Sequence, residues 1–300
     1  MSALPETPGV TLEAAGLIAL RQVALRSGAD PALSNLPGGY ATRRKGQGQE
    51  VADVREYVPG DDIRHLDRGS TARSGVLHVR QFQQERDRVC LLVADFRPPM
   101  LWGLTRAFLS VAAAEALALT GWRVVEEGGR VALLVVTPGR PVIVPPRGRV
   151  RGMLDVVGGL VRAHRDALEA VLDGATEGPA LDGALSSVER LAPRGAEIVL
   201  ATGLDRPGAG FADRLAALSR NRAPRLLVLS GLNPEKMPGG RYPICLPDGR
   251  RLRVTLEGRR ATTAAPEAEV AGVPAQFLDA GQPVEAMARA LALSTAPVRP

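Results

Sequence analysis

The fold is decided by the stretch VCLLVADFRPPM at residues 89–100. Its first six residues are all apolar, which is the pattern of a parallel strand that helices cover on both faces. Asp95 follows this run directly, and the chain then turns through Pro98 and Pro99. We therefore expect a buried central strand that ends in a carboxylate, at the sheet edge where doubly wound folds place their ligands.

Apolar runs and helical patterns alternate after this strand. Further strands are expected at 131–136, 142–144, 198–201 and 226–229, and helices at 105–119, 153–171, 181–191 and 212–218. Such alternation predicts a doubly wound α/β fold with a mostly parallel sheet. Residues 242–246 and 251–256 flank a Pro-Asp-Gly turn and predict a terminal hairpin or a pair of edge strands.

The flanking segments complete a predicted organisation in four parts. We expect an N-terminal helix and loop at 1–40, a small β-rich subdomain at 41–88, the α/β domain at 89–256, and a linker with a C-terminal helix and tail at 257–300. The first part has apolar residues at helical spacing between Leu12 and Leu25. That helix is expected to pack on the domain or to dock a partner.

Composition restricts the class of protein. The chain has 300 residues, 45% of them hydrophobic and 23% charged, which suits a globular protein. No apolar run approaches the roughly 20 residues of a membrane span, and the first residues lack a signal-peptide pattern. Cys90 and Cys245 have no metal-binding or redox spacing and are expected to be reduced thiols. These features predict a cytoplasmic protein.

The net charge of +6 raises the possibility of nucleic-acid binding. Almost all of the basic charge is arginine, scattered along the chain and interleaved with carboxylates, and only 3% of residues are aromatic. A nucleic-acid interface concentrates its charge on one face, often beside stacking aromatics. The pattern favours a solvated arginine-rich surface over nucleic-acid binding, which stays as an alternative.

The most specific motif precedes the central strand. It reads REYVPGDDIRHLD at residues 55–67, continues as TARSG at 71–75 and ends as VRQFQQE at 79–85. Pro59 and Gly60 predict a tight turn, because proline fixes φ and glycine adopts positive φ freely. Asp61 and Asp62 can bind backbone N–H groups or pair with nearby arginines such as Arg64 and Arg73. The singled-out residues are Tyr57, Pro59, Gly60, Asp61, Asp62, Arg64, Asp67, Thr71 and Arg73.

This motif resembles the signature of the domain of unknown function 58 family, R-x-Y-x-P-G-D-D-x-R-x-I-D-W followed by T-A-R. The resemblance covers about residues 40–255 and includes LNPEKMP at 232–238. It implies a von Willebrand factor A-like, Rossmann-like sheet and cooperation with a MoxR-type AAA+ ATPase. Arg68 stands where the family has tryptophan, so the packing at that position must differ.

A metal-binding domain of the von Willebrand type ends its first strand in D-x-S-x-S, and oxygen ligands from later loops complete a Mg²⁺ site. Here Asp95 is retained, but Arg97 and Pro99 replace the two serines. The loop at 177–180 reads EGPA without a threonine, and Thr202 stands where an aspartate is expected. We therefore expect no metal and no cofactor, and we predict that Arg97 forms a salt bridge with Asp95.

Catalytic alternatives have weaker support. His65, His78 and His164 lie far apart without ligand spacing, and no GxSxG motif is present. A hydrolase that uses Asp61, Asp62 and Asp67 with His65 would need those groups to converge in one pocket. The chain is therefore expected not to be an enzyme.

A docking surface is suggested by MLWG at residues 100–103, since Trp and Met are enriched in interface cores. Trp102 packing under its own loop is the equally weighted alternative. The leading hypothesis is a non-enzymatic adaptor that binds a MoxR-type AAA+ ATPase or its client. Its surface would be the loops after Asp95 and around Thr202. Nucleic-acid binding and an uncharacterised hydrolase are the competing hypotheses.

Overall fold

Two compact units make up the chain in the computed structural model, Met1–Pro31 with Arg88–Pro300 (the main unit) and Ala32–Asp87 (the signature unit). The structure describes residues 7–28, 51–59, 61–82, 88–231, 240–245, 251–256 and 267–294. The expected boundaries at 40 and 256 differ from this division, because both terminal segments contribute elements to the main unit.

A mixed sheet is the centre of the main unit. Within the described residues it has seven strands in the order β10-β11-β7-β6-β3-β4-β5. Their bounds are β3 Val89–Asp95, β4 Arg130–Val136, β5 Val142–Gly148, β6 Glu197–Thr202, β7 Ala223–Ser230, β10 Glu267–Val270 and β11 Val273–Asp279. The five inner strands are parallel and the two outer strands, β5 and β10, are antiparallel to their neighbours. This order confirms the predicted doubly wound, mostly parallel sheet.

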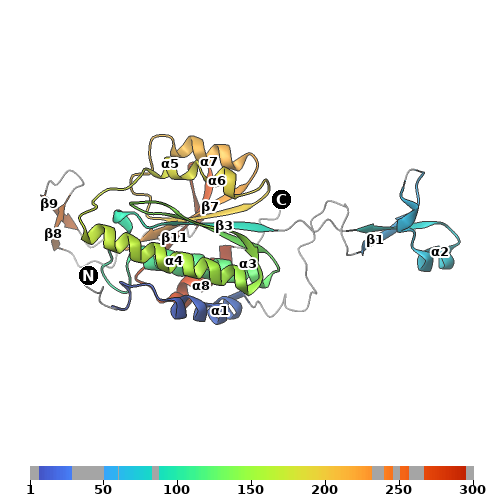
Figure 1. The fold of residues 1–300 in the computed structure, drawn as a ribbon, viewed down its shortest axis with the longest axis horizontal. Coiled ribbons are helices and arrows are strands. Elements are labelled where there is room, and N and C mark those ends of the chain that lie inside the picture. Colours follow the sequence, from blue (N-terminus) through green and yellow to red (C-terminus); the bar gives the residue numbers. More distant parts are fainter. Residues whose placement is uncertain are drawn as a thin grey trace. The chain divides into compact units, whose positions relative to one another are not determined.

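Two helical layers cover the sheet (Figure 1). One layer contains α1 (Ala14–Gly28), α3 (Leu109–Glu126), α4 (Arg149–Leu172) and α8 (Val284–Ser294), and the other contains α5 (Leu181–Leu185), α6 (Val188–Leu191) and α7 (Phe211–Ser219). Alternate residues of β3 serve the two cores: Leu92 and Ala94 face the first layer, whereas Leu91 and Val93 face the second. The unbroken apolar run that predicted this strand reflects burial on both sides.

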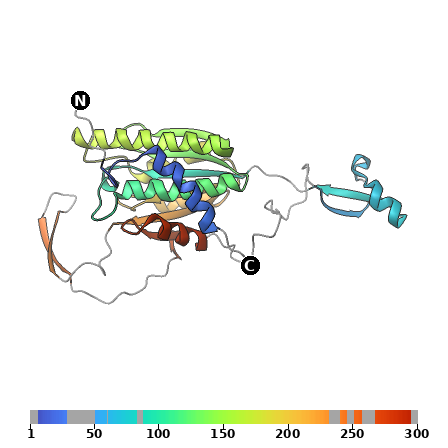
Figure 2. The ribbon, with the colours of Figure 1, turned by 90° about the horizontal axis from the view of Figure 1, so that it is seen from below.

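The N-terminal helix α1 belongs to the first layer, where it crosses α3 obliquely between α4 and α8 (Figure 2). Leu17 of α1 is buried, and the indole N–H of Trp122 on α3 donates to the Leu17 carbonyl at 3.0 Å. Arg21 pairs with Glu126 at 2.7 Å and lies 5.7 Å from the centre of the Trp122 ring. These contacts favour packing over partner docking as the role of this helix.

The C-terminal segment differs most from the expected linker. β11 pairs in parallel with β7, with Ala275 opposite Leu226, and α8 then buries Met287 and Leu291 in the first core. The hairpin expected near 242–256 is present as β8 (Gly240–Cys245) and β9 (Arg251–Leu256), an antiparallel pair that forms its own sheet. The sequence pattern therefore located the hairpin but not the strand that extends the main sheet.

The strand that was expected at 142–144 is longer in the structure, where it is β5. β5 continues through Pro145 and Pro146 to Gly148. Proline is tolerated at a sheet edge, because the N–H that it lacks would have no partner strand on the outer side. β4 and β5 accommodate it with a register shift between Val131 and Leu133.

The signature unit is small and β-rich in its described part. β1 (Val51–Glu56) and β2 (His78–Phe82) pair antiparallel, and a 3₁₀ turn (Ile63–His65) and α2 (Arg68–Ser74) connect them. Gly60 of the predicted turn lies outside the described residues.

The structure bears on two expectations drawn from the composition, one about membrane spans and one about the cysteines. None of the helices in the described ranges has both the length and the apolar character needed to cross a membrane. Cys90 is a free and fully buried thiol, and burial raises its pKa well above the usual value. The side chain of Cys245 lies outside the described residues.

Candidate functional site

The candidate site lies at the carboxyl end of β3, where Asp95 and Arg97 form a buried ion pair. The Nε of Arg97 is 2.8 Å from Asp95 Oδ1, and its Nη2 is 2.8 Å from Asp95 Oδ2. Each residue is only 1% exposed. The parallel fork geometry is the one in which a guanidinium binds a carboxylate most strongly.

The remaining guanidinium donors of Arg97 bind backbone carbonyls of two other loops. Its Nη1 donates to Pro179 at 3.0 Å and to Arg206 at 3.1 Å, and its Nη2 donates to Asp205 at 2.6 Å. A guanidinium has five N–H donors. All five are used, so this buried cation carries no unsatisfied donor.

The acceptor positions of the Asp95 carboxylate are also all used. Besides its two bonds to the guanidinium, it accepts the backbone N–H of Arg97 at 3.1 Å and the hydroxyl of Thr202 at 2.8 Å. An ionised carboxylate offers about four lone-pair positions. We call the acceptors around the guanidinium the Arg97 cage: the side chain of Asp95, supported by Thr202, and the carbonyls of Pro179, Asp205 and Arg206.

Local sequence explains how the carbonyls reach the guanidinium. The loop after β6 has non-glycine residues at positive φ, Leu204 at 60° and Arg206 at 45°. Such left-handed conformations are unfavourable by on the order of 1 kcal/mol each and persist where the surroundings fix them. Here the Thr202 hydroxyl accepts the N–H of Leu204 at 3.0 Å, and the loop then curls back over Arg97.

The loop before α5 is held from two sides. An added Cβ at Gly178 would lie 3.1 Å from the Arg97 side chain, so this glycine permits the close approach. Asp182 accepts the N–H of Gly210 at 3.0 Å, and its own N–H donates to the Pro207 carbonyl at 3.0 Å. The ends of β3 and β6 and the start of α5 are thereby connected at one edge of the sheet.

The residues at this edge do not fit a divalent cation. The four acceptor positions of Asp95 are already used, and a guanidinium lies where the positive charge of an ion would have to be. Pro99, in the second serine position, has no hydroxyl and lies in a 3₁₀ turn spanning Pro98–Met100. A metal could bind Asp95 only after Arg97 had moved away.

The predicted docking residues lie beside the cage. Met100 is buried, and its Sδ is 3.1 Å from the N–H of Gly203, which connects the loops after β3 and β6. Trp102 is 36% exposed and Leu104 is 57% exposed. Trp102 is therefore neither fully packed under its loop nor fully free.

The signature unit has its acidic residues in structural bonds. Asp61 pairs with Arg55 at 2.6 Å and accepts the Val58 N–H at 2.9 Å, and these two hydrogen bonds hold the pKa of its carboxyl below the usual value. Asp62 accepts the N–H of Arg64 at 2.9 Å and so caps the 3₁₀ turn. Of the two kinds of partner foreseen for these aspartates, the backbone groups are present and the salt bridge goes to Arg55.

The other residues of the motif also hold the turn together. Asp67 accepts the hydroxyl of Ser70 at 2.8 Å, and the hydroxyl of Thr71 accepts the N–H of His78 at 3.0 Å. Arg73 donates to the Gly69 carbonyl of its own helix at 3.2 Å. The aspartates of the hydrolase hypothesis thus have structural partners. Within the described ranges, no group of three or more His, Cys, Asp or Glu side chains could hold a metal.

A buried polar pair between α3 and α4 was not predicted from the sequence. Ser110 Oγ lies 3.0 Å from His164 Nε2, and the Phe96 ring meets the imidazole edge to face at 5.3 Å. Burial lowers the pKa of His164 to about 4, so this histidine is neutral at physiological pH. The two residues are 54 positions apart, and no local spacing predicts their contact.

Comparison with known proteins identifies a family. The model for "Protein of unknown function DUF58" matches residues 53–226, more than half of the chain. Uncharacterized proteins from Mycobacterium bovis and from two strains of Mycobacterium tuberculosis are 33% identical over 115 residues, which is 37% of this chain. The chain matches only 35% of the length of each of these relatives.

A solved structure described as a von Willebrand factor type A protein from Catenulispora acidiphila shows a weaker likeness. It matches with a TM-score of 0.36 at 18% identity and covers 52% of this chain and 36% of its own. At that score the two structures are only distantly alike. The doubly wound fold is established by the strand order and helix layers of this chain itself.

Proposed function

This chain belongs to the DUF58 family, and from that premise we propose that it is a non-enzymatic adaptor that binds a protein partner at the carboxyl edge of its sheet. In this proposal the guanidinium of Arg97 takes the place that a metal ion has in adhesion domains of the von Willebrand type. The recognition surface is therefore built without an ion.

The saturated hydrogen bonding of the Arg97 cage carries this proposal. Five guanidinium donors meet five oxygen acceptors, and these acceptors come from three separate segments of the chain. A cation that belongs to the chain cannot dissociate, so the loops around it keep one arrangement. Such pre-organisation favours binding, because less loop entropy is lost when a partner docks.

The neighbouring loops supply apolar contact area. Trp102 and Leu104 are exposed on the segment that follows β3, and Met100 of the same segment contacts the loop after β6 at the Gly203 N–H. Aromatic and aliphatic side chains of this kind are typical anchors in the centre of protein interfaces. No catalytic group is required for this role.

The partner that we propose is a MoxR-type AAA+ ATPase or a client of one. This choice rests on the resemblance to the family, and the net charge of +6 is consistent with steering an acidic partner. The experiment below distinguishes a specific surface from nonspecific binding.

The test is affinity capture from native extract with the full chain as bait, quantified by mass spectrometry. Leu104→Ser removes an exposed apolar side chain at the proposed surface, and Val150→Ser removes one of 38% exposure at the start of α4. We expect a stoichiometric AAA+ ATPase or client that Leu104→Ser reduces and Val150→Ser retains. Recovery of no stable partner, or equal recovery with both variants, would contradict the proposal.

A further inference from the structure

A small pocket lies between the segment that precedes α1 and the second half of α4. Its volume is about 200 Å³. Leu12, Val161 and Leu168 give it apolar walls, and the imidazole of His164 also lines it. We call this space the His164 pocket.

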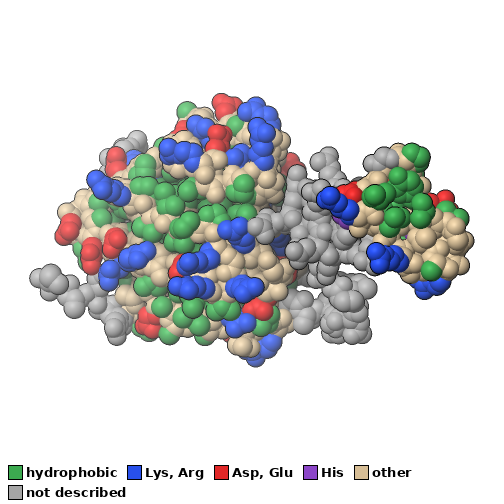
Figure 3. All heavy atoms as spheres, turned by 45° about the vertical axis from the view of Figure 1, so that its right-hand side comes forward, with side chains coloured by type: hydrophobic (Ala, Val, Ile, Leu, Met, Phe, Trp, Pro, Cys, Tyr) green, Lys and Arg blue, Asp and Glu red, His purple; other side chains and the backbone are tan. Residues whose placement is uncertain are grey.

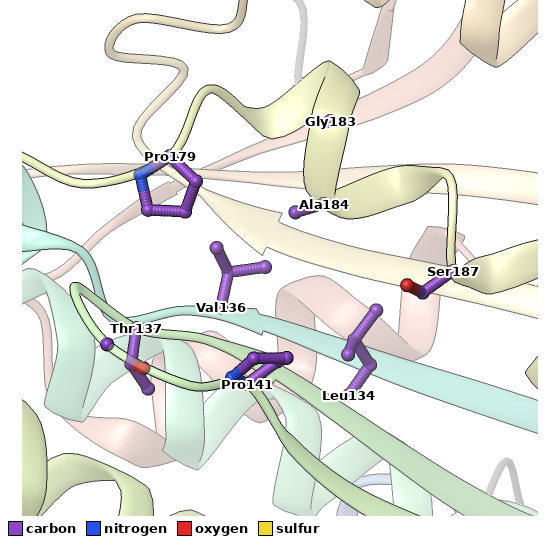
Figure 4. A pocket seen from close by; sticks show the side chains of 9 residues that line it. Leu134, Val136, Thr137, Pro141, Pro179, Gly183, Ala184 and Ser187 are labelled. Atoms are coloured by element: carbon purple, nitrogen blue, oxygen red, sulfur yellow. The ribbon is translucent and has the colours of Figure 1, made fainter.

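A second pocket, shown in Figure 4, offers no group that would select a ligand. It lies between Leu134 and Val136 of β4 and Ala184 of α5, and those two β4 side chains are buried members of the core under α5, α6 and α7. Its two hydroxyl groups, of Thr137 and Ser187, have partners. Hydrophobic and basic side chains are spread together over the face seen in Figure 3, so apolar exposure alone does not single out a site either. The His164 pocket differs, because it contains a polar atom without a partner.

This atom is the Nδ1 of His164. The other ring nitrogen, Nε2, lies 3.0 Å from Ser110 Oγ, and that contact is the one hydrogen bond of the imidazole among the described residues. His164 is only 1% exposed, and buried polar groups are nearly always hydrogen-bonded. In the described part of the chain, Gln276 Oε1 is the one side-chain N or O atom that is both sealed from solvent and without a partner. Nδ1 is therefore not sealed, and the space that it reaches is the pocket that the imidazole lines.

Ser110 decides which ring nitrogen carries the proton. Its hydroxyl is fully buried on α3, and across the described ranges His164 Nε2 is the one acceptor that it reaches. A buried hydroxyl proton is costly to leave unpaired, so Ser110 donates and Nε2 accepts. A neutral imidazole has one donor and one acceptor nitrogen, which places the ring proton on Nδ1. His164 therefore presents an N–H donor to the pocket.

The N-terminal wall of the pocket is fixed without a ligand. The Gly9 carbonyl accepts the N–H of Phe108 at 2.8 Å, and a Cβ at Gly9 would lie 2.1 Å from the carbonyl oxygen of Arg106. The N–H and the hydroxyl of Thr11 both donate to the Thr7 carbonyl, at 3.0 and 3.1 Å. This segment is thus held against the start of α3, and the pocket is formed in advance of binding.

The size and the charges of the pocket suit a small neutral ligand. Its charged lining residues, Glu13 and Arg165, are exposed and opposite in sign, and Arg165 also lies 3.9 Å from Asp166. The lining therefore offers no excess positive charge to an anion, and the N–H of His164 disfavours a cation. The volume is below the roughly 300–1,000 Å³ of drug-sized sites. Since a cavity of about 150 Å³ holds benzene, a molecule of about six to eight non-hydrogen atoms fits.

We propose that the His164 pocket binds a small neutral molecule that carries a carbonyl oxygen on an apolar body. The oxygen accepts the Nδ1–H of His164, and the body packs against Leu12, Val161 and Leu168. Ser110 is a positioning residue, because it fixes the donor nitrogen from the far side of the ring and does not line the pocket. The site shares no residue with the Arg97 cage and goes beyond the adaptor function.

The direct test titrates two molecules of the same shape into the full chain and follows binding by NMR. Cyclohexanone carries the oxygen, and methylenecyclohexane has a CH₂ group in its place. Cyclohexanone should shift the signals of Leu12, Val161 and Leu168 and bind about fivefold more tightly than the hydrocarbon, because it gains one neutral hydrogen bond. Nitrogen spectra of the imidazole should show the proton of His164 on Nδ1. Absence of cyclohexanone binding, equal affinities, shifts elsewhere in the protein, or a proton on Nε2 would overturn the inference.

Two variants test the donor and the walls separately. His164→Gln keeps an amide that reaches Ser110 but has no N–H at the Nδ1 position, so the preference for cyclohexanone should vanish. Val161→Phe should fill the pocket and abolish binding of both molecules, with the Ser110 contact intact. Leu154→Phe, at a 42% exposed position about two turns earlier on α4, is the matched control and should change neither. A preference that persists in His164→Gln, or binding that persists in Val161→Phe, would count against the proposed site.

Discussion

The guanidinium of Arg97 and the carboxylate of Asp95 show how two side chains can fix three loops. A buried ion pair gains little stability in net terms, because desolvation of both charges offsets their attraction. Removal of one of the two side chains is costly, since the remaining charge stays buried without a partner. The pair therefore specifies the arrangement of the loops more than it raises the stability of the fold.

A double-mutant cycle measures this coupling. We expect Arg97→Ala to lower the free energy of unfolding by about 3–5 kcal/mol, because it leaves Asp95 buried and uncompensated. Asp95→Ala should be costly for the matching reason, and the double variant should lose less than the two single losses combined. Urea denaturation monitored by circular dichroism gives all four values.

Arg97→Lys is the control for charge alone. Lysine keeps the positive charge but offers three donors from a single atom, so it cannot meet acceptors on three loops. It should therefore fall between the unmodified chain and Arg97→Ala. Additive losses in the cycle would show that the two side chains do not act as a pair.

His164 should make stability depend on pH. Its pKa is lowered by burial from 6.5 to about 4, so the unfolded chain binds a proton more readily than the folded chain. The contribution is fully present above pH 6.5, declines as the pH falls, and is lost near pH 4, a change of about 3 kcal/mol.

The measurement is the free energy of unfolding of the unmodified chain and of His164→Gln between pH 7 and about pH 5. Glutamine cannot take up a proton in this range, and its amide can still hydrogen-bond to Ser110. The decline between these pH values should be much smaller in the variant. A decline of equal size in both proteins would show that other groups cause it.

At the scale of elements, α3 and α4 approach each other closely because Gly121 lacks a side chain. A Cβ at Gly121 would lie 2.7 Å from Met153 Sδ and 3.0 Å from Leu92 Cδ1. Both neighbours are fully buried, so the crowding cannot be relieved toward solvent. Gly158 on α4 has no atom within 4 Å of the same position.

Two alanine substitutions test this packing. Gly121→Ala should destabilise the protein by about 1–3 kcal/mol, because an extra methyl overpacks a filled core. Gly158→Ala should stabilise it by up to about 1 kcal/mol through helix propensity. Thermal unfolding compares the two directly, and an increase in stability for Gly121→Ala would contradict the close approach of the two helices.

The elements that could be predicted from the sequence are those whose burial produces a recognisable apolar pattern. The runs of β3 and β4 are apolar throughout because helices cover both faces, and their strands were located within a residue or two. β11 was missed because Pro274, Gln276 and Asp279 interrupt its apolar pattern, although Ala275 and Leu278 point into the two cores.

The candidate site was predictable only in its side chains. The D-x-R spacing at the end of β3 predicted the ion pair between Asp95 and Arg97, and the structure contains it. The carbonyls of Pro179, Asp205 and Arg206 were missed, since a backbone acceptor has no residue type and its position depends on the whole fold.

At the scale of the whole molecule, the last described segment completes the sheet and the core of the main unit. β11 and α8 bury Val273, Leu278, Met287 and Leu291, so the sheet is incomplete when the chain stops at the hairpin. Many arginines of this unit pair with carboxylates, among them Arg88, Arg106 and Arg225. This pairing lowers the free charge that nucleic-acid binding would require.

A chain that ends at residue 256 tests the closure of the sheet. Loss of four large buried side chains removes roughly 6–12 kcal/mol of burial, comparable to the whole stability of a typical domain. We expect the shortened chain to lack cooperative thermal unfolding by circular dichroism. An unfolding midpoint equal to that of the full chain would show that the segment after 256 is dispensable.

The central claim is that a side-chain cation replaces a bound ion at the end of β3. Isothermal titration calorimetry of the full chain with Mg²⁺ and with Mn²⁺ tests it most directly. The account predicts no stoichiometric binding at millimolar concentrations, because Arg97 and Thr202 already use every acceptor position of Asp95. One-to-one binding that disappears in Asp95→Ala would contradict it.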